Sequence, residues 1–70
     1  MNKITEFQAM LLDNLEEDGE WAVEDSNGPE KRSLNILFER GMVGGRYYAN
    51  GEHVYLTEKG LEFVEEYRDR

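Results

Sequence analysis

Carboxylates are the most abundant chemically active side chains in this sequence of 70 residues, which has 16 Asp and Glu residues, one histidine and no cysteine. Paired carboxylates can act as general acid and base, but no nucleophile, glycine-rich phosphate loop or metal-ligand spacing accompanies them. The single histidine, His53, is expected to point away from Glu52, because adjacent residues of a strand face opposite sides. The sequence therefore predicts a protein that is not an enzyme and that uses no metal, cofactor or small-molecule substrate.

The net charge of −8 is spread unevenly along the chain. Residues 1–28 carry one basic and eight acidic side chains, residues 29–49 carry four basic and two acidic ones, and residues 50–70 carry three basic and six acidic ones. The basic residues of the middle third are Lys31, Arg32, Arg40 and Arg46. A surface that binds nucleic acid must neutralise phosphates, so the total charge opposes that function and the middle third favours it. Four basic residues in such a stretch are equally compatible with ordinary solvated surface.

Apolar spacing predicts a first helix that ends near Gly19 and is capped at its start by Asn2 or Thr5. Its apolar face is formed by Ile4, Phe7, Leu11 and Leu15. Residues 20–24 alternate as a short strand does, and we expect the only tryptophan, Trp21, to be buried there.

Turn-forming residues at 25–28 precede Pro29, which suits the first position of a helix. We expect this second helix to cover residues 29–40 and to bury Leu34, Leu37 and Phe38. Outside that apolar face, the helix carries Arg32, Asn35 and Ile36.

The pair Asn50-Gly51 predicts a hairpin with a two-residue type I′ turn, in which both residues have positive φ. With that turn, Tyr48 would face His53 and Tyr47 would face Val54 across the hairpin. The inward residues would be Tyr47, Val54 and Leu56, and the outward residues Tyr48, His53 and Tyr55.

Thr57 would cap a last helix whose apolar face contains Leu61, Val64 and Tyr67. The order of elements is therefore helix, strand, helix, hairpin, helix. We interpret residues 1–70 as one α+β domain without repeats or linkers.

Residues 33–43 and 54–60 resemble segments of winged-helix DNA-binding domains. Residues 33–43, Ser-Leu-Asn-Ile-Leu-Phe-Glu-Arg-Gly-Met-Val, are similar to the recognition helix and the step into the wing. Residues 54–60, Val-Tyr-Leu-Thr-Glu-Lys-Gly, are similar to the end of the wing, where the family has Tyr-x-Leu-Thr-x-x-Gly and this chain has Val54 in place of the tyrosine. Only nine residues separate Gly19 from Pro29, so the first helix of the helix-turn-helix is expected to be shortened or missing. That helix normally crosses the DNA backbone, so its loss would alter the docking geometry.

The resemblance implies that helix 29–40 reads a DNA groove and that residues 46–53 form the wing. Arg32 and Asn35 have side chains that can read guanine and adenine, respectively. Lys31, Arg40 and Arg46 would contact phosphates, and Arg32, Asn35, Arg40 and Arg46 would form one continuous face. The implied function is a small DNA-binding transcriptional regulator. A homodimer or a protein partner would add the affinity that one small module lacks.

The acidic composition favours a second hypothesis, in which the domain binds a protein and no DNA. A winged-helix scaffold does not fix function, and such a module could be a virus-encoded antagonist or a nucleic-acid mimic. Its interface would contain the outward apolar residues Ile36, Tyr48 and Tyr55. Single exposed apolar residues are also normal on any protein surface.

No apolar run approaches the roughly 18 residues of a membrane span, and residues 1–10 lack the apolar stretch of a signal peptide. We therefore expect a cytoplasmic protein that does not contact a membrane.

Overall fold

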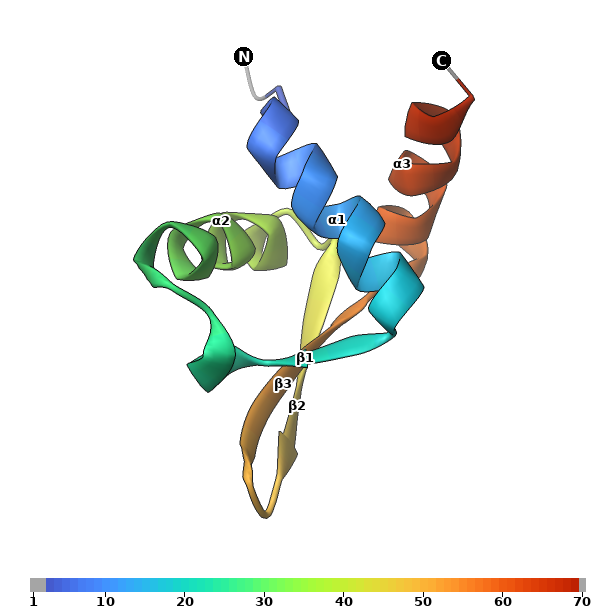
Figure 1. Ribbon diagram of the computed structural model, residues 1–70. Helices are drawn as coiled ribbons and strands as arrows, with labels where there is room; N and C mark the ends of the chain where they lie inside the picture. Colours follow the sequence, from blue (N-terminus) through green and yellow to red (C-terminus); the bar gives the residue numbers. More distant parts are fainter. Residues whose placement is uncertain (1–2, 70) are drawn as a thin grey trace.

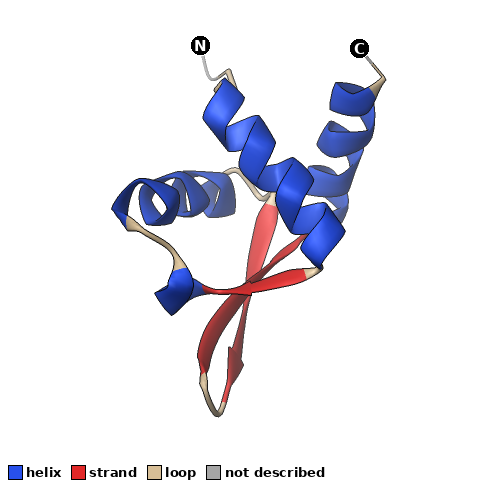
Figure 2. Ribbon diagram, viewed as in Figure 1, coloured by secondary structure: helices blue, strands red, loops and turns tan. Residues whose placement is uncertain are grey.

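The computed structural model describes residues 3–69, so the alternative helix cap at Asn2 lies outside the described residues. Three helices surround one end of a three-stranded sheet (Figures 1 and 2). In chain order the elements are α1 (Glu6–Asp18), β1 (Glu20–Ala22), the 3-10 turn η1 (Val23–Asp25), α2 (Gly28–Glu39), β2 (Val43–Tyr48), β3 (Gly51–Leu56) and α3 (Glu58–Arg68). The α+β class and the predicted order of elements are confirmed.

Local sequence sets the ends of the helices. The side chains of Thr5, Asn27 and Thr57 accept hydrogen bonds from backbone N–H groups in the first turns of α1, α2 and α3, as the sequence predicts for Thr5 and Thr57. Gly19 and Gly41 follow α1 and α2 with φ of 90° and 80°, a conformation that favours glycine.

The strand expected over residues 20–24 is shorter, because the chain turns into η1 after Ala22. The N–H of Ser26 closes this turn by donating to the carbonyl of Val23 at 3.0 Å. The turn η1 occupies the place where the resemblance puts the first helix of the helix-turn-helix. The expectation that this helix is shortened is therefore confirmed.

The core lies between the three helices and one face of the sheet. Its fully buried side chains are Leu12, Leu15, Leu37, Val43 and Val64. Leu34 and Val54 complete the buried cluster. The buried positions expected on α2 at Leu34 and Leu37 are confirmed.

Four expectations about burial are wrong. Phe7, Phe38 and Leu61 are 40%, 54% and 37% exposed, because each lies at the edge of a helix face whose other positions, such as Leu11, Leu37 and Val64, are buried. Trp21 is only partly buried, since its indole N–H donates to the Asp18 carboxylate at 2.7 Å and so holds the ring at the edge of the core.

The hairpin differs from the predicted pairing by two residues. Tyr48 pairs with Gly51, and Tyr47 pairs with Glu52, so the two-residue turn is formed by Ala49 and Asn50. The positive φ falls on Gly51 alone, at 119°, which excludes a type I′ turn. A shift of two residues keeps every side chain on its expected face. Tyr47 nevertheless lies beyond the end of the core and is 81% exposed.

The sheet is antiparallel, with the strand order β1-β3-β2, and the β2–β3 hairpin extends away from the helices (Figure 1). The start of α1 and the end of α3 lie at the opposite end of the molecule from the hairpin turn (Figure 1). The described part measures 38 × 20 × 17 Å along its principal axes. None of its helices has the length and apolar character needed to cross a membrane.

Candidate nucleic-acid interface

A groove of about 460 Å³ separates α2 from the β2–β3 hairpin. Val23, Leu34 and Val54 supply apolar lining. The polar and aromatic residues that line it are Lys31, Arg32, Asn35, Phe38, Tyr47 and Glu52. We call this feature the α2–hairpin groove. It combines cations, an amide, a carboxylate and two exposed aromatic rings within one concave surface.

Lys31, Arg32 and Asn35 form the polar side of the groove on α2. All three are exposed, and within residues 3–69 their side chains make no hydrogen bond or ion pair. The nearest acid along the helix, Glu30, is committed elsewhere, because its Oε1 accepts from the backbone N–H of Asn27 at 3.0 Å. The cations are therefore available to an external anion.

The exposure of the two aromatic residues that line the groove was not predicted from the sequence. Phe38 was expected in the core and Tyr47 on the inner sheet face, yet they are 54% and 81% exposed. Glu52, which pairs with Tyr47, is half-buried and also lacks a side-chain partner within residues 3–69. The predicted pairing of Tyr47 with Val54 gave no signal that this part of the hairpin extends past the core, because the polar partner Glu52 follows from the shifted register.

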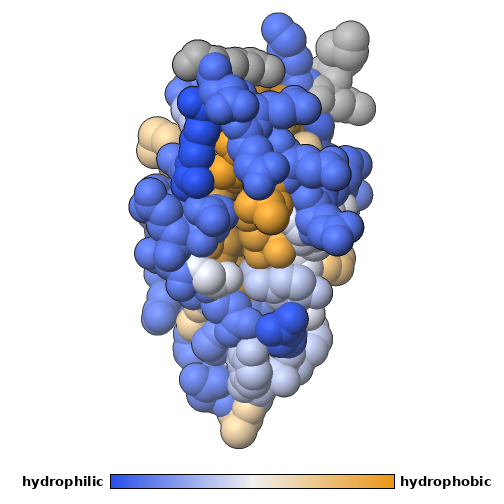
Figure 3. Space-filling view, turned by 90° about the vertical axis from the view of Figure 1, so that its right-hand side faces the viewer, coloured by the Kyte–Doolittle hydropathy of each residue, from blue (hydrophilic) through white to orange (hydrophobic). Residues whose placement is uncertain are grey.

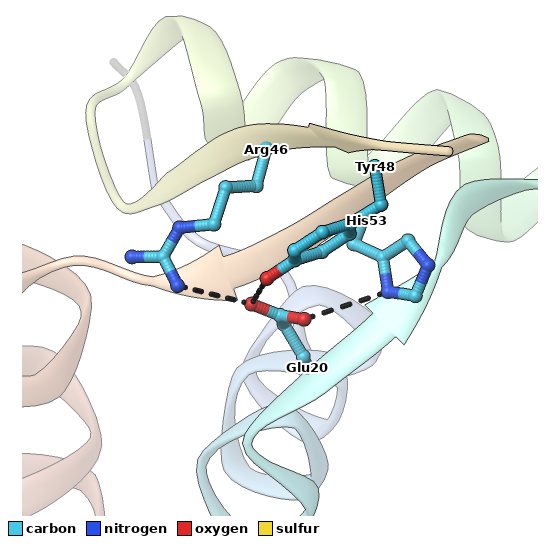
Figure 4. A network of polar contacts seen from close by, with 4 residues as sticks. All are labelled: Glu20, Arg46, Tyr48 and His53. Carbon is cyan, nitrogen blue, oxygen red and sulfur yellow. Dashed lines mark hydrogen bonds and ion pairs between the residues drawn. The ribbon is translucent and has the colours of Figure 1, made fainter. Parts of the chain in front are cut away.

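Arg46 lies on the other face of the sheet and does not line the α2–hairpin groove. Its Nη1 donates to Glu20 Oε2 at 3.2 Å, and the Tyr48 hydroxyl donates to the same oxygen at 2.9 Å (Figure 4). His53 Nδ1 lies 3.5 Å from Glu20 Oε1, so residues from β1, β2 and β3 meet at one carboxylate (Figure 4). The guanidinium of Arg46 also lies 4.3 Å from the centre of the Tyr55 ring.

This network keeps Arg46 positively charged and holds its guanidinium in a contact within the chain. The hydrogen bond with Tyr48 and then the Glu20 carboxylate raise the pKa of Arg46 above its ordinary value. The expectation of one continuous face through Arg32, Asn35 and Arg46 is not met, because Arg46 contacts Glu20 from β1 instead.

Arg40 caps the C-terminal end of α2, away from Lys31 and Arg32 at its start. Its backbone carbonyl accepts a hydrogen bond from Lys59 Nζ at 2.8 Å. Arg40 does not line the groove. The structure therefore brings Lys31, Arg32 and Asn35 together and places Arg40 and Arg46 elsewhere.

No family model matches the chain, and no curated protein matches it. A comparison of structures matches it to a crystal structure described as a possible transcriptional regulator for arsenical resistance. The TM-score is 0.65 and the identity 24%, and the match covers 91% of this chain and 74% of the other. The chain has a winged-helix fold. In this fold, β2 and β3 form the wing.

The apolar residues expected to form a protein interface do not gather into one patch on this winged helix. Ile36 is 42% exposed on α2, and Tyr48 is 44% exposed on the sheet face that carries Arg46. Tyr55 is only half-buried rather than fully outward, because the Arg46 guanidinium covers its ring.

A different apolar recess lies between α1 and α3. It is lined by Leu15, Leu56 and Leu61, with Glu16 and Glu58 at its rim. Viewed from the side of α3, the molecule exposes apolar surface framed by polar surface (Figure 3). The described residues hold no group of three or more metal-ligating side chains in either recess or elsewhere.

Proposed function

We propose that this protein is a small DNA-binding regulator of winged-helix type, which contacts DNA with α2 and the wing. The observation that carries this proposal is the cluster of uncommitted polar side chains on α2, formed by Lys31, Arg32 and Asn35. Arg46 and Arg68 are already paired with carboxylates of the same chain. The matched structure, which is described as a possible transcriptional regulator, supports the same function.

The side chains of α2 have complementary roles in this proposal. Arg32 can donate two hydrogen bonds to guanine, and Asn35 can make a bidentate contact with adenine. Lys31 and Arg40 contact phosphates on either side and set the register. The acidic residues of α1 and α3 lie on the helical end of the molecule, opposite the wing, where salt screens their repulsion within about 8 Å.

Direct binding measurements test this function. Fluorescence anisotropy with a mixed-sequence DNA duplex in about 50 mM salt should show binding that Lys31→Gln weakens for all sequences alike. Lys3→Gln makes the same charge change outside the groove and should leave the affinity unchanged. An absence of binding to every duplex would contradict the proposal.

The apolar recess between α1 and α3 favours a second candidate function, in which the domain docks on a basic protein partner. Exposed Leu61 supplies an apolar contact, and Glu16 and Glu58 supply negative charge. Under this alternative, Leu61→Lys abolishes capture of the partner, and no DNA is bound.

A further inference from the structure

The α2–hairpin groove contains two features that ordinary duplex binding does not use. Tyr47 exposes four-fifths of its surface, although tyrosine usually buries its ring where it can. Glu52 presents a half-buried carboxylate without a partner within residues 3–69, next to cations that would be expected to attract it. Both residues lie on the wing side of the groove, facing α2.

These residues match the chemistry of an unpaired nucleobase. Aromatic side chains that bind single-stranded nucleic acid stack on bases, and nearby cations hold the flanking phosphates. Tyr47 and Phe38 supply exposed rings, while Lys31 and Arg32 supply the charges. A paired base inside a duplex cannot enter such a groove, whereas a base that is out of the stack can.

The polar lining selects among bases. A carboxylate accepts a hydrogen bond from the exocyclic amino group of cytosine, and an asparagine amide pairs with the edge of adenine. Glu52 and Asn35 line the same groove. An unpaired thymine donates only its N3–H to Glu52 and lacks the amino group and ring nitrogen that an asparagine amide matches on adenine, so Asn35 is the residue that distinguishes adenine from thymine.

We propose that the α2–hairpin groove holds one unpaired base of the bound nucleic acid, adenine in preference to thymine, stacked on Tyr47 and hydrogen-bonded to Glu52 or Asn35. This inference rests on the proposed DNA-binding function and adds a preference for DNA with a base out of the stack. Peptide occupancy of the groove is the competing outcome.

The test compares three labelled probes: a perfect duplex, the same duplex with one bulged adenine, and the same duplex with one bulged thymine. Fluorescence anisotropy with the wild-type chain should show at least about five-fold tighter binding to the adenine bulge than to the perfect duplex. Tyr47→Ala should remove this preference, so that the bulged and perfect duplexes bind with equal affinity. Tyr47→Phe keeps the ring and should keep the preference. Asn35→Ala should reduce the discrimination between the adenine and thymine bulges.

The possible results distinguish a failure of this inference from a failure of the proposed DNA-binding function. Equal affinity for the perfect and bulged duplexes would overturn the inference and leave the proposed function intact. A preference for the adenine bulge that persists in Tyr47→Ala would also overturn it, because the base would then not be stacked on this ring. Binding to no probe would overturn both. Since Tyr47 is 81% exposed, its substitution should not unfold the domain, and a melting curve verifies this.

Discussion

At the scale of single residues, Glu20 determines what Arg46 can contact. The carboxylate accepts hydrogen bonds from Arg46 and Tyr48, and it holds the guanidinium against the outer sheet face. The sequence could not show this contact, because the two residues are 26 positions apart and lie on different strands. Sequence patterns marked Arg46 as a candidate phosphate contact but could not show its intramolecular partner.

Removing the Glu20 charge should therefore strengthen DNA binding. Glu20→Gln releases Arg46 for a phosphate contact, so we expect the affinity for DNA to rise. The slope of log affinity against log salt should steepen by about the contribution of one phosphate contact. Anisotropy titrations at several salt concentrations measure both effects. Glu62→Gln, which makes the same charge change on α3, controls for the lower net charge. Equal gains in both variants would show that Glu20 acts only through its charge.

Gly60 illustrates a different residue-scale constraint. A Cβ atom at this position would overlap the carbonyl oxygen of Met42 and the Leu56 side chain. Gly60→Ala should destabilise the domain by about 1–3 kcal/mol through overpacking, despite the higher helix propensity of alanine. Urea denaturation measures the change. Gly28→Ala is the matched control, because its nearest neighbour is 4.0 Å away, and it should be close to neutral.

At the scale of elements, local signals predicted the existence of the helices and strands better than their buried faces. Caps such as Thr57 and the glycine after α2 act within a few residues, so they are visible in sequence. The face that a helix buries depends on the elements packed against it. That is why Phe38 and Leu61 were expected in the core and are exposed, whereas Leu37 was expected there and is fully buried.

The contrast between α2 and α3 leads to a paired prediction. Leu37→Ala should cost about 2–5 kcal/mol, because it creates a cavity in the core. Leu61→Ala removes the same atoms from a side chain that is 37% exposed, so it should cost well under half as much. Thermal and urea unfolding of the two variants measure the difference. Similar losses would place Leu61 in the core and contradict the orientation of α3.

The contact between α1 and α3 should depend on alkaline pH. The Tyr67 hydroxyl donates to Glu6 Oε2 at 2.8 Å, and this hydrogen bond is the main reason that the pKa of Tyr67 is raised. A raised pKa in the folded state stabilises the protein below the unfolded value of about 10 and loses that effect as pH rises through the folded value. Denaturation between pH 8 and 11 should therefore show a loss of stability that is smaller in Tyr67→Phe. An identical pH profile in both proteins would show that the hydrogen bond contributes nothing.

At the scale of the whole molecule, the fold places acidic and basic side chains in different regions, which the net charge of the sequence does not show. Arg68 from α3 contacts Asp13 and Glu16 of α1, so the acidic residues near the chain ends are partly balanced there. The uncommitted cations Lys31 and Arg32 lie at the groove beside the wing. The basic residues of the middle third predicted the cations at this groove in part. They could not show that Arg46 lies elsewhere, in contact with Glu20.

The salt dependence of DNA binding tests the central claim most directly. We expect log affinity to fall linearly with log salt, and Lys31→Gln to reduce the slope by about 0.9, the contribution of one phosphate contact. Lys3→Gln should leave the slope unchanged. Parallel slopes for the wild type and Lys31→Gln, or an absence of DNA binding at the lowest salt, would contradict a DNA-binding face on α2.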